Sequence, residues 1–242
     1  MKRLISIALG LFAFLNFVLA TACVFILLLF KKNDGKEYPL TGHLSLFWGK
    51  WIAWSFFLKI KIVGLEKFNP NARYIIVANH QSSLDPLVIM SIFPIGLVTI
   101  AQKKLLKVPI LGPGLRASGV IFVDLKKRLQ VVEKAVNCLV NSSLSMYAFP
   151  SGTRKSDIFK TGVFHIAIQA EQAGCKDLML LPVTIEKTKK VWPSNTLVDL
   201  DRTVTIVMRV REPVAIGDFL KNCDYEARVD GLLRYARKQI YG

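Results

Sequence analysis

The sequence has few acidic residues, few histidines and few cysteines. Its 242 residues include 17 Asp and Glu against 33 Lys and Arg, which gives a formal net charge of +16. The four cysteines lie far apart and form no Cys-x-x-Cys pair, so the sequence indicates neither a zinc knuckle nor a small disulfide-stabilised secreted fold. The hydrophobic fraction of 52% excludes a disordered chain. A protein that is both basic and apolar suits two kinds of partner, nucleic acid or an anionic membrane.

Charged residues are missing from residues 4–30, a run of 27 positions. A helix of this length would be about 40 Å long, more than the roughly 30 Å of a bilayer core. A cleaved signal peptide is the alternative, but its apolar segment usually has about 7–15 residues. This run continues past its one plausible cleavage site, near Ala20. We therefore expect a retained membrane helix, whose orientation is not readable because basic residues flank both ends.

A second apolar stretch covers residues 44–63 and includes three of the four tryptophans. Aromatic rings and long lysine side chains favour the headgroup zone of a bilayer, so we expect an interfacial aromatic helix here. A core helix of a soluble domain and a second membrane span paired with the first are the alternatives. The side chains that support the interfacial prediction are Trp48, Trp51, Trp54, Lys50, Lys59 and Lys61.

From residue 64 onward, short β-rich runs alternate with amphipathic segments. This alternation predicts an α/β fold, a layered mixed sheet with flanking helices, in residues 64–242, preceded by a membrane anchor and interfacial helix in residues 1–63. The expected strands are residues 74–78, 97–101, 120–123, 145–149, 179–184 and 204–210. The expected helices are residues 126–139, 163–173 and 225–240.

The first candidate site follows the strand expected at residues 74–78. It reads Asn79-His80-Gln81-Ser82-Ser83-Leu84-Asp85-Pro86. Asp followed by Pro is typical of a helix start, so Asp85 could be a helix cap next to an incidental histidine. Alternatively, the turn folds Asp85 back onto His80, fixes its tautomer and leaves the other ring nitrogen as a general base. No Gly-x-Ser-x-Gly motif occurs, so little supports a serine acyl-enzyme, and the substrate would bring its own hydroxyl.

The second candidate site is Phe149-Pro150-Ser151-Gly152-Thr153-Arg154, directly after another expected strand. A Pro-x-Gly turn presents backbone amides, and an arginine beside it adds a permanent cation. Amides and guanidinium together suit a phosphate group. A solvated turn with a surface arginine is the alternative. No metal-ligand pattern appears, and we expect no metal site.

The two sites together resemble the 1-acyl-sn-glycerol-3-phosphate acyltransferase (lysophosphatidic acid acyltransferase) family. Its members carry a His-x4-Asp block and a Phe-Pro-Glu-Gly-Thr-Arg block about seventy residues apart, and here His80 and Gly152 are separated by 72 positions. Weaker matches lie in order at residues 101–124, 159–162 and 181–184. The resemblance covers roughly residues 64–215.

The resemblance implies transfer of a fatty acyl group from acyl-CoA or acyl-carrier protein to the free hydroxyl of lysophosphatidic acid, giving phosphatidic acid for phospholipid biosynthesis. His80 would be the general base and Asp85 its partner. Gly152, Thr153 and Arg154, assisted by Lys103, would bind the acceptor phosphate, with Ser151 in the same block. No metal or tightly bound cofactor is implied, because the thioester donor is itself a substrate.

Two departures from the family pattern bear on the acceptor. Ser151 stands where the family has glutamate, and Leu125 followed by Lys126 stands where the second block usually has an arginine. Because the His and Asp are intact, the departures concern acceptor identity more than catalysis. Another lysolipid or an ornithine-lipid-type acceptor is one alternative, and a catalytically inactive membrane-bound lipid-binding protein is the other.

Nucleic acid is not an expected partner. The sequence has no RNP, zinc-finger or basic-region pattern, and its apolar excess lies in the first 63 residues. Both parts are basic, with eight basic against two acidic residues in 1–63 and 25 against 15 in 64–242. This charge favours an anionic phospholipid bilayer, a phosphate-bearing acceptor and a polyanionic donor. We expect location at the cytoplasmic or an equivalent membrane, with the active site facing the cytosol because thioester donors are cytosolic.

Overall fold

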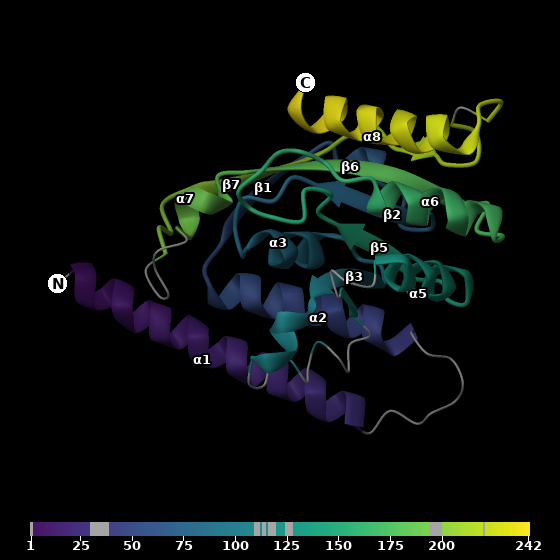
Figure 1. Ribbon diagram of the computed structural model, residues 1–242. Helices are drawn as coiled ribbons and strands as arrows, with labels where there is room; N and C mark the ends of the chain where they lie inside the picture. The colour runs from purple at the N-terminus through teal and green to yellow at the C-terminus, as the bar shows by residue number, and fades with distance from the viewer. Residues whose placement is uncertain are drawn as a thin grey trace.

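The structure is a computed structural model, and helices cover both faces of its central sheet (Figure 1). The strands are β1 (Lys59–Val63), β2 (Arg73–Ala78), β3 (Leu97–Gln102), β4 (Ile121–Val123), β5 (Ser145–Ala148), β6 (Leu178–Glu186), β7 (Thr205–Val210) and β8 (Val214–Ala215). The α-helices are α1 (Lys2–Leu29), α2 (Pro39–Ser55), α3 (Asp85–Ile92), α5 (Arg128–Val140), α6 (Gly162–Gln172), α7 (Thr188–Val191) and α8 (Tyr225–Tyr241), and η1 (Leu65–Lys67) and η2 (Lys103–Lys107) are 3-10 helices. The structure describes residues 2–29, 39–108, 112, 115, 120–123, 128–193, 200–219 and 221–242.

The sheet is mixed. Its described strands number eight and run in the order β1-β7-β6-β2-β5-β3-β4, with β8 paired to β6. Strands β2 to β6 are mutually parallel, whereas β7 and β8 are antiparallel to β6 and β1 is parallel to β7. The carboxyl ends of β2, β5 and β6 therefore lie at one edge of the sheet, where loops that follow parallel strands commonly build a site.

Both faces of the sheet are buried, because side chains alternate along each strand. In β2, Ile75 and Val77 pack into a core formed with α5, α6 and α8. Tyr74 and Ile76 point to the opposite face and pack with residues of α1, α2 and α3. A strand that is buried on both faces has a continuous run of apolar residues in the sequence, and this run made β2 predictable. The α/β layered fold is confirmed.

All six strands and all three helices predicted for the α/β part occur, with shifted ends. The interfacial helix predicted through residue 63 is wrong in its second part, because α2 ends at Ser55 and residues 59–63 form β1. The Lys-Ile-Lys-Ile-Val sequence of β1 has the period of two that a strand requires, and it pairs in parallel with β7 at the end of the sheet. Lysines on an edge strand also discourage pairing with another chain.

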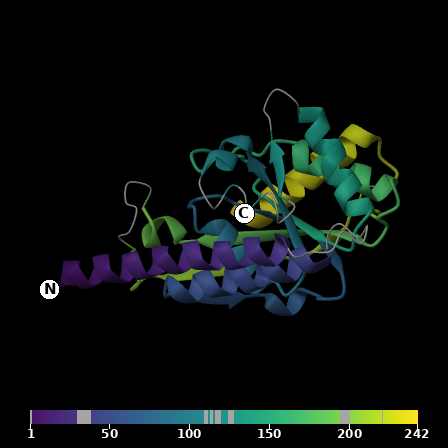
Figure 2. The same ribbon diagram turned by 90° about the horizontal axis from the view of Figure 1, so that it is seen from below.

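Helices α1 and α2 lie side by side below the sheet (Figures 1 and 2). Two of the few polar side chains in α1 face α2: the Trp48 indole donates to Thr21 Oγ1 at 3.0 Å, and the Trp51 indole donates to Asn16 Oδ1 at 3.2 Å. Within the described part of the chain, no helix combines the length and apolar content needed to cross a membrane. The membrane helix predicted for residues 4–30 is therefore not supported by the structure.

Helix α2 in turn packs directly on α3, the helix that begins at Asp85. Gly49 lies at the contact, and a Cβ atom added there would come within 2.7 Å of the Met90 backbone. Only glycine permits this approach, since such a contact would force the helices apart. The apolar helices and the predicted site are thus joined by close helix packing.

Candidate active site

The candidate active site lies where β2 ends. Asn79, the next residue, is buried and bonds both ways to Ile185 of β6: its Nδ2 donates to the Ile185 carbonyl at 2.8 Å, and its Oδ1 accepts from the Ile185 amide at 2.7 Å. The side chain thereby continues the pairing of β2 with β6 beyond Ala78. This anchor fixes the start of the loop that carries His80.

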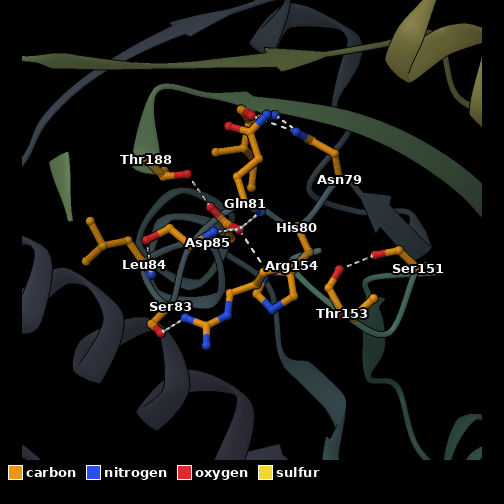
Figure 3. Close-up of polar contacts among 12 residues, drawn as sticks. Asn79, His80, Gln81, Ser83, Leu84, Asp85, Ser151, Thr153, Arg154 and Thr188 are labelled. Carbon is orange, nitrogen blue, oxygen red and sulfur yellow. Dashed lines mark hydrogen bonds and ion pairs between the residues drawn. The ribbon is translucent and has the colours of Figure 1, made fainter. Parts of the chain in front are cut away.

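His80 and Asp85 are in contact. The Nδ1 atom of His80 is 2.8 Å from Oδ2 of Asp85, and Asp85 is fully buried. The same oxygen accepts from the backbone amides of Gln81 at 2.6 Å and Ser82 at 2.7 Å (Figure 3). Asp85 is the first residue of α3 but does not cap it, because its carboxylate turns back to the preceding loop. The turn that folds Asp85 onto His80 is the arrangement observed.

The His80 ring is held by stacking as well as by Asp85. It lies on the Phe149 ring, with centroids 4.2 Å apart and planes 17° from parallel. An ionised carboxylate only accepts hydrogen bonds, so Nδ1 carries the proton and the lone pair falls on Nε2. The side chain is 19% exposed, so the imidazole reaches the surface while its partner is shielded. This geometry suits a general base.

The turn after β5 brings a cation to the same loop. Arg154 Nη1 donates to Ser83 Oγ at 2.7 Å, and Ser83 lies between His80 and Asp85 in the sequence (Figure 3). Gly152 has a φ of +65°, in the left-handed region that favours glycine. Its amide donates to the Phe149 carbonyl at 2.9 Å, which closes the turn. The two candidate sites are therefore adjacent in space.

Other residues of the predicted site have more varied environments. Ser151 is buried and its hydroxyl donates to the Thr153 carbonyl at 2.8 Å, so it stabilises the turn that carries Arg154. Gly152 is exposed and Thr153 is half-buried. Lys103 is exposed at the start of η2, directly after β3, which is parallel to β5 at the same edge of the sheet. The second-block residues 124–127, which include Leu125 at the position of the family's arginine and the lysine after it, lie outside the described residues.

Two contributors to this site had no predicted role. Phe149 lay in a recognised block, but its stacking on His80 depends on the order of β2 and β5 in the sheet. Thr188 is buried at the start of α7, and its hydroxyl donates to Asp85 Oδ1 at 2.6 Å (Figure 3). No motif includes Thr188, and the two residues are 103 positions apart. No local sequence signal could have found this contact.

Tyr147, two residues before Phe149, is a titratable group next to the site. Burial raises the pKa of its phenol far above the ordinary value, although a hydrogen bond with Thr99 acts in the opposite direction. The phenol therefore remains protonated at physiological pH and does not compete with His80 for the role of base.

Known proteins with similar sequences are acyltransferases by name. The 1-acyl-sn-glycerol-3-phosphate acyltransferase alpha of Homo sapiens is 34% identical over 127 residues, which cover 50% of this chain and 45% of the human protein. The 1-acyl-sn-glycerol-3-phosphate acyltransferase of Limnanthes douglasii is 30% identical over 187 residues, 74% of this chain and 62% of the plant protein. This chain thus spans about half the length of the mammalian relatives that it matches.

The fold has a counterpart among solved structures. The crystal structure of the 1-acyl-sn-glycerophosphate (LPA) acyltransferase PlsC from Thermotoga maritima superposes with a TM-score of 0.72 at 20% identity, over 98% of this chain and 95% of that one. A family model described as Acyltransferase matches residues 59–186, which begin at β1 and include both candidate sites. The predicted resemblance is confirmed, and the chain belongs to this acyltransferase family.

Proposed function

We propose that this chain transfers a fatty acyl group from acyl-CoA or acyl-carrier protein to the free hydroxyl of lysophosphatidic acid, giving phosphatidic acid. The observation that supports this most directly is the contact of His80 with the buried Asp85, with Arg154 bonded to the loop between them. A base and a phosphate-binding cation at one place suit an acceptor that carries both a hydroxyl and a phosphate. The names of the human and plant relatives also specify this acceptor, 1-acyl-sn-glycerol 3-phosphate.

In the proposed reaction, Nε2 of His80 takes the proton from the acceptor hydroxyl as its oxygen attacks the thioester carbonyl carbon. Asp85 stabilises the imidazolium that forms, and its buried carboxylate keeps the ring oriented. The tetrahedral intermediate then collapses: the carbon–sulfur bond breaks, and the departing thiolate takes the proton back from His80. The new ester bond and the free thiol balance the reaction without a metal or further cofactor.

The acceptor phosphate is assigned to Gly152, Thr153 and Arg154, assisted by Lys103. A guanidinium makes charge-assisted hydrogen bonds to phosphate oxygens, and the exposed Gly152 offers backbone approach without a side chain. Ser151 is buried and bonded to Thr153, so its proposed contribution is to shape this turn. Because Ser151 stands where the family has the longer, charged glutamate, the headgroup specificity should be measured with several lysolipids.

The proposed location is a membrane surface with anionic phospholipids, with the site facing the cytosol. Support comes from large apolar side chains that remain exposed on α1 and α2 and from lysines beside them, because such surfaces bind lipid. The exposed apolar residues are Leu11, Phe12, Phe14, Leu15, Leu19, Ile26, Phe47 and Trp54. Lys50, in the second half of α2, and Lys59, at the start of β1, are also exposed. We call the eight apolar residues the apolar face of α1 and α2.

The test measures acyl transfer from acyl-CoA to lysophosphatidic acid in membranes for the wild type and His80→Ala. We expect robust transfer by the wild type and a loss of at least about 1,000-fold in the variant, since a base that is removed leaves only binding and positioning. Equal rates would refute the mechanism. Transfer only to another lysolipid would reassign the acceptor, and no transfer to any lysolipid would favour a lipid-binding protein without catalysis.

A further inference from the structure

The two oxygens of Asp85 have different partners. Oδ2 is hydrogen-bonded to His80 Nδ1 and accepts from the backbone amides of Gln81 and Ser82. All three partners belong to the loop directly before Asp85. Oδ1 accepts a hydrogen bond at 2.6 Å from the hydroxyl of Thr188, which lies in the segment that follows β6. Both Asp85 and Thr188 have no exposed surface. The carboxylate is therefore held from two directions by segments that are distant in sequence.

We infer that Thr188 is a positioning residue for the proposed acyl transfer: its hydroxyl fixes the rotation of the Asp85 carboxylate so that Oδ2 faces His80. This inference rests on the function proposed above. A buried carboxylate oxygen that loses its donor retains the cost of desolvation. The carboxylate would then turn toward other donors, and the imidazole would lose its alignment.

The backbone around Thr188 supports the inference. Lys187, directly before it, has a φ of +71°, a left-handed conformation that is uncommon for a residue with a side chain. Such strained positions persist where the surrounding structure enforces them, and they concentrate at functional sites. In this chain the turn leads into α7 with the Thr188 hydroxyl directed at Asp85 (Figure 3).

The far end of α7 is also attached to the site loop. Ser82 Oγ is 3.4 Å from the Trp192 carbonyl oxygen and donates to it, and the Trp192 ring meets Phe56 edge-to-face with centroids 5.8 Å apart. The Trp192 amide donates to the Thr188 carbonyl at 2.9 Å, which closes the helix. Both ends of the short helix α7 are thus hydrogen-bonded to the loop of residues 80–85, through Thr188 at its start and Trp192 at its end.

The experiment compares Thr188→Val, which keeps the shape and removes the hydroxyl, with Thr188→Ser, which keeps the hydroxyl. We expect Thr188→Val to lower kcat by about 10- to 100-fold, as a misplaced catalytic group does, with KM for both substrates changed by less than about twofold. Thr188→Ser should recover kcat to within about threefold. If the valine variant does not fold, Thr188→Ala replaces it in the same comparison.

Thr184→Val is the matched control. Thr184 is a buried threonine of β6 on the face of the sheet away from Asp85; its hydroxyl donates to the Ile240 carbonyl of α8 at 3.3 Å and accepts from Arg211 Nε at 3.2 Å. Thr184→Val removes both of these hydroxyl contacts, as Thr188→Val removes the contact with Asp85, so it should lower thermal stability while kcat stays within about twofold. A kcat of Thr188→Val within twofold of wild type, or a serine variant as slow as the valine variant, would overturn the inference.

A spectroscopic readout separates this inference from the proposed function. The proton on His80 Nδ1 is hydrogen-bonded to a carboxylate and should resonate downfield of an ordinary imidazole N–H in the full chain. Thr188→Val should shift or broaden this resonance, and Thr188→Ser and Thr184→Val should preserve it. An unchanged resonance in Thr188→Val would refute the positioning role. If the wild type transfers acyl groups to no lysolipid, the proposed function fails, and the resonance still decides the role of Thr188.

Discussion

Arg154 and Ser83 are 71 residues apart in the chain, yet Nη1 of Arg154 lies 2.7 Å from Oγ of Ser83. Ser83 belongs to the loop that starts with His80 and ends with Asp85, so a neutral hydroxyl holds the guanidinium at the loop that carries the proposed base. A hydroxyl is a weaker partner for a guanidinium than a carboxylate is. Under the proposed function, Arg154 would exchange this contact for an oxygen of the acceptor phosphate.

Replacing Arg154 should weaken binding of the acceptor more than that of the donor. A hydrogen bond to a charged group contributes about 1.5–3 kcal/mol, so Arg154→Ala should raise KM for lysophosphatidic acid by about 10- to 100-fold. The KM for acyl-CoA should change by less than about twofold. Steady-state kinetics with each substrate varied in turn measures both values.

The control for this change is Arg234→Ala, which removes an arginine of α8 whose side chain is 82% exposed. We expect this variant to keep both KM values, because α8 packs on the opposite face of the sheet from α3. A similar rise in the acceptor KM in both variants would mean that general positive charge, rather than Arg154, attracts the substrate.

Two glycine replacements should affect stability with opposite signs. Gly152 has a φ of +65°, so Gly152→Ala forces a side chain into the left-handed region and should lower the free energy of unfolding by about 1–2 kcal/mol. Gly162, the first residue of α6, has open space around a Cβ atom. Gly162→Ala should raise the free energy of unfolding by about 0.4–1 kcal/mol. Urea unfolding measures the free energy of unfolding of both variants. Equal changes in the two variants would contradict the left-handed conformation of Gly152.

Glu171 should contribute stability that depends on pH. The hydrogen bond from Lys176, with the charges of Lys176 and Arg228, holds the pKa of Glu171 below its ordinary value, although burial acts in the opposite direction. The contribution is complete above the unfolded pKa of about 4.3 and is lost as pH falls through the lower folded pKa. Glu171→Gln should therefore reduce the free energy of unfolding at pH 7 by about 1–2 kcal/mol and by less near pH 3.

Unfolding in urea at both pH values tests this prediction. Glu133→Gln, which changes an exposed glutamate of α5, is the control and should leave the free energy of unfolding unchanged at pH 7. If the loss in the free energy of unfolding caused by Glu171→Gln is larger near pH 3 than at pH 7, the prediction is refuted.

The apolar face of α1 and α2 should bind lipid. Leu15 and Trp54 are 57% and 64% exposed, so the pair Leu15→Ser and Trp54→Ser removes apolar area without opening the core. We expect the double variant to associate at least about tenfold more weakly with phosphatidylcholine–phosphatidylglycerol vesicles, as measured by flotation. Leu129→Ser, which changes an 86% exposed leucine of α5, should bind as wild type does. Equal flotation of all three proteins would exclude this face as the attachment surface.

The predictable parts of this protein are those in which neighbours in sequence are neighbours in space. His80 and Asp85 are five residues apart, so their pairing could be proposed from the loop alone. Strand β1 was missed because its five-residue alternation follows an aromatic helix that dominates the local composition. Thr188 was missed for a different reason: its contact with Asp85 exists only because β6 lies beside β2. Strand order is a property of the whole chain, and no local pattern reports it.

The close approach of Gly49 to Met90 has a mechanical consequence. Helix α3 starts at Asp85, and at this point no side chain separates its backbone from that of α2, so we expect a tilt of α2 to displace Asp85, which contacts His80. The proposed lipid-binding helices and the proposed active site are therefore joined through the contact of α2 with α3. Exchanging the α1–α2 segment with that of another family member would preserve the site only if the incoming helix also lacks a side chain where it crosses α3.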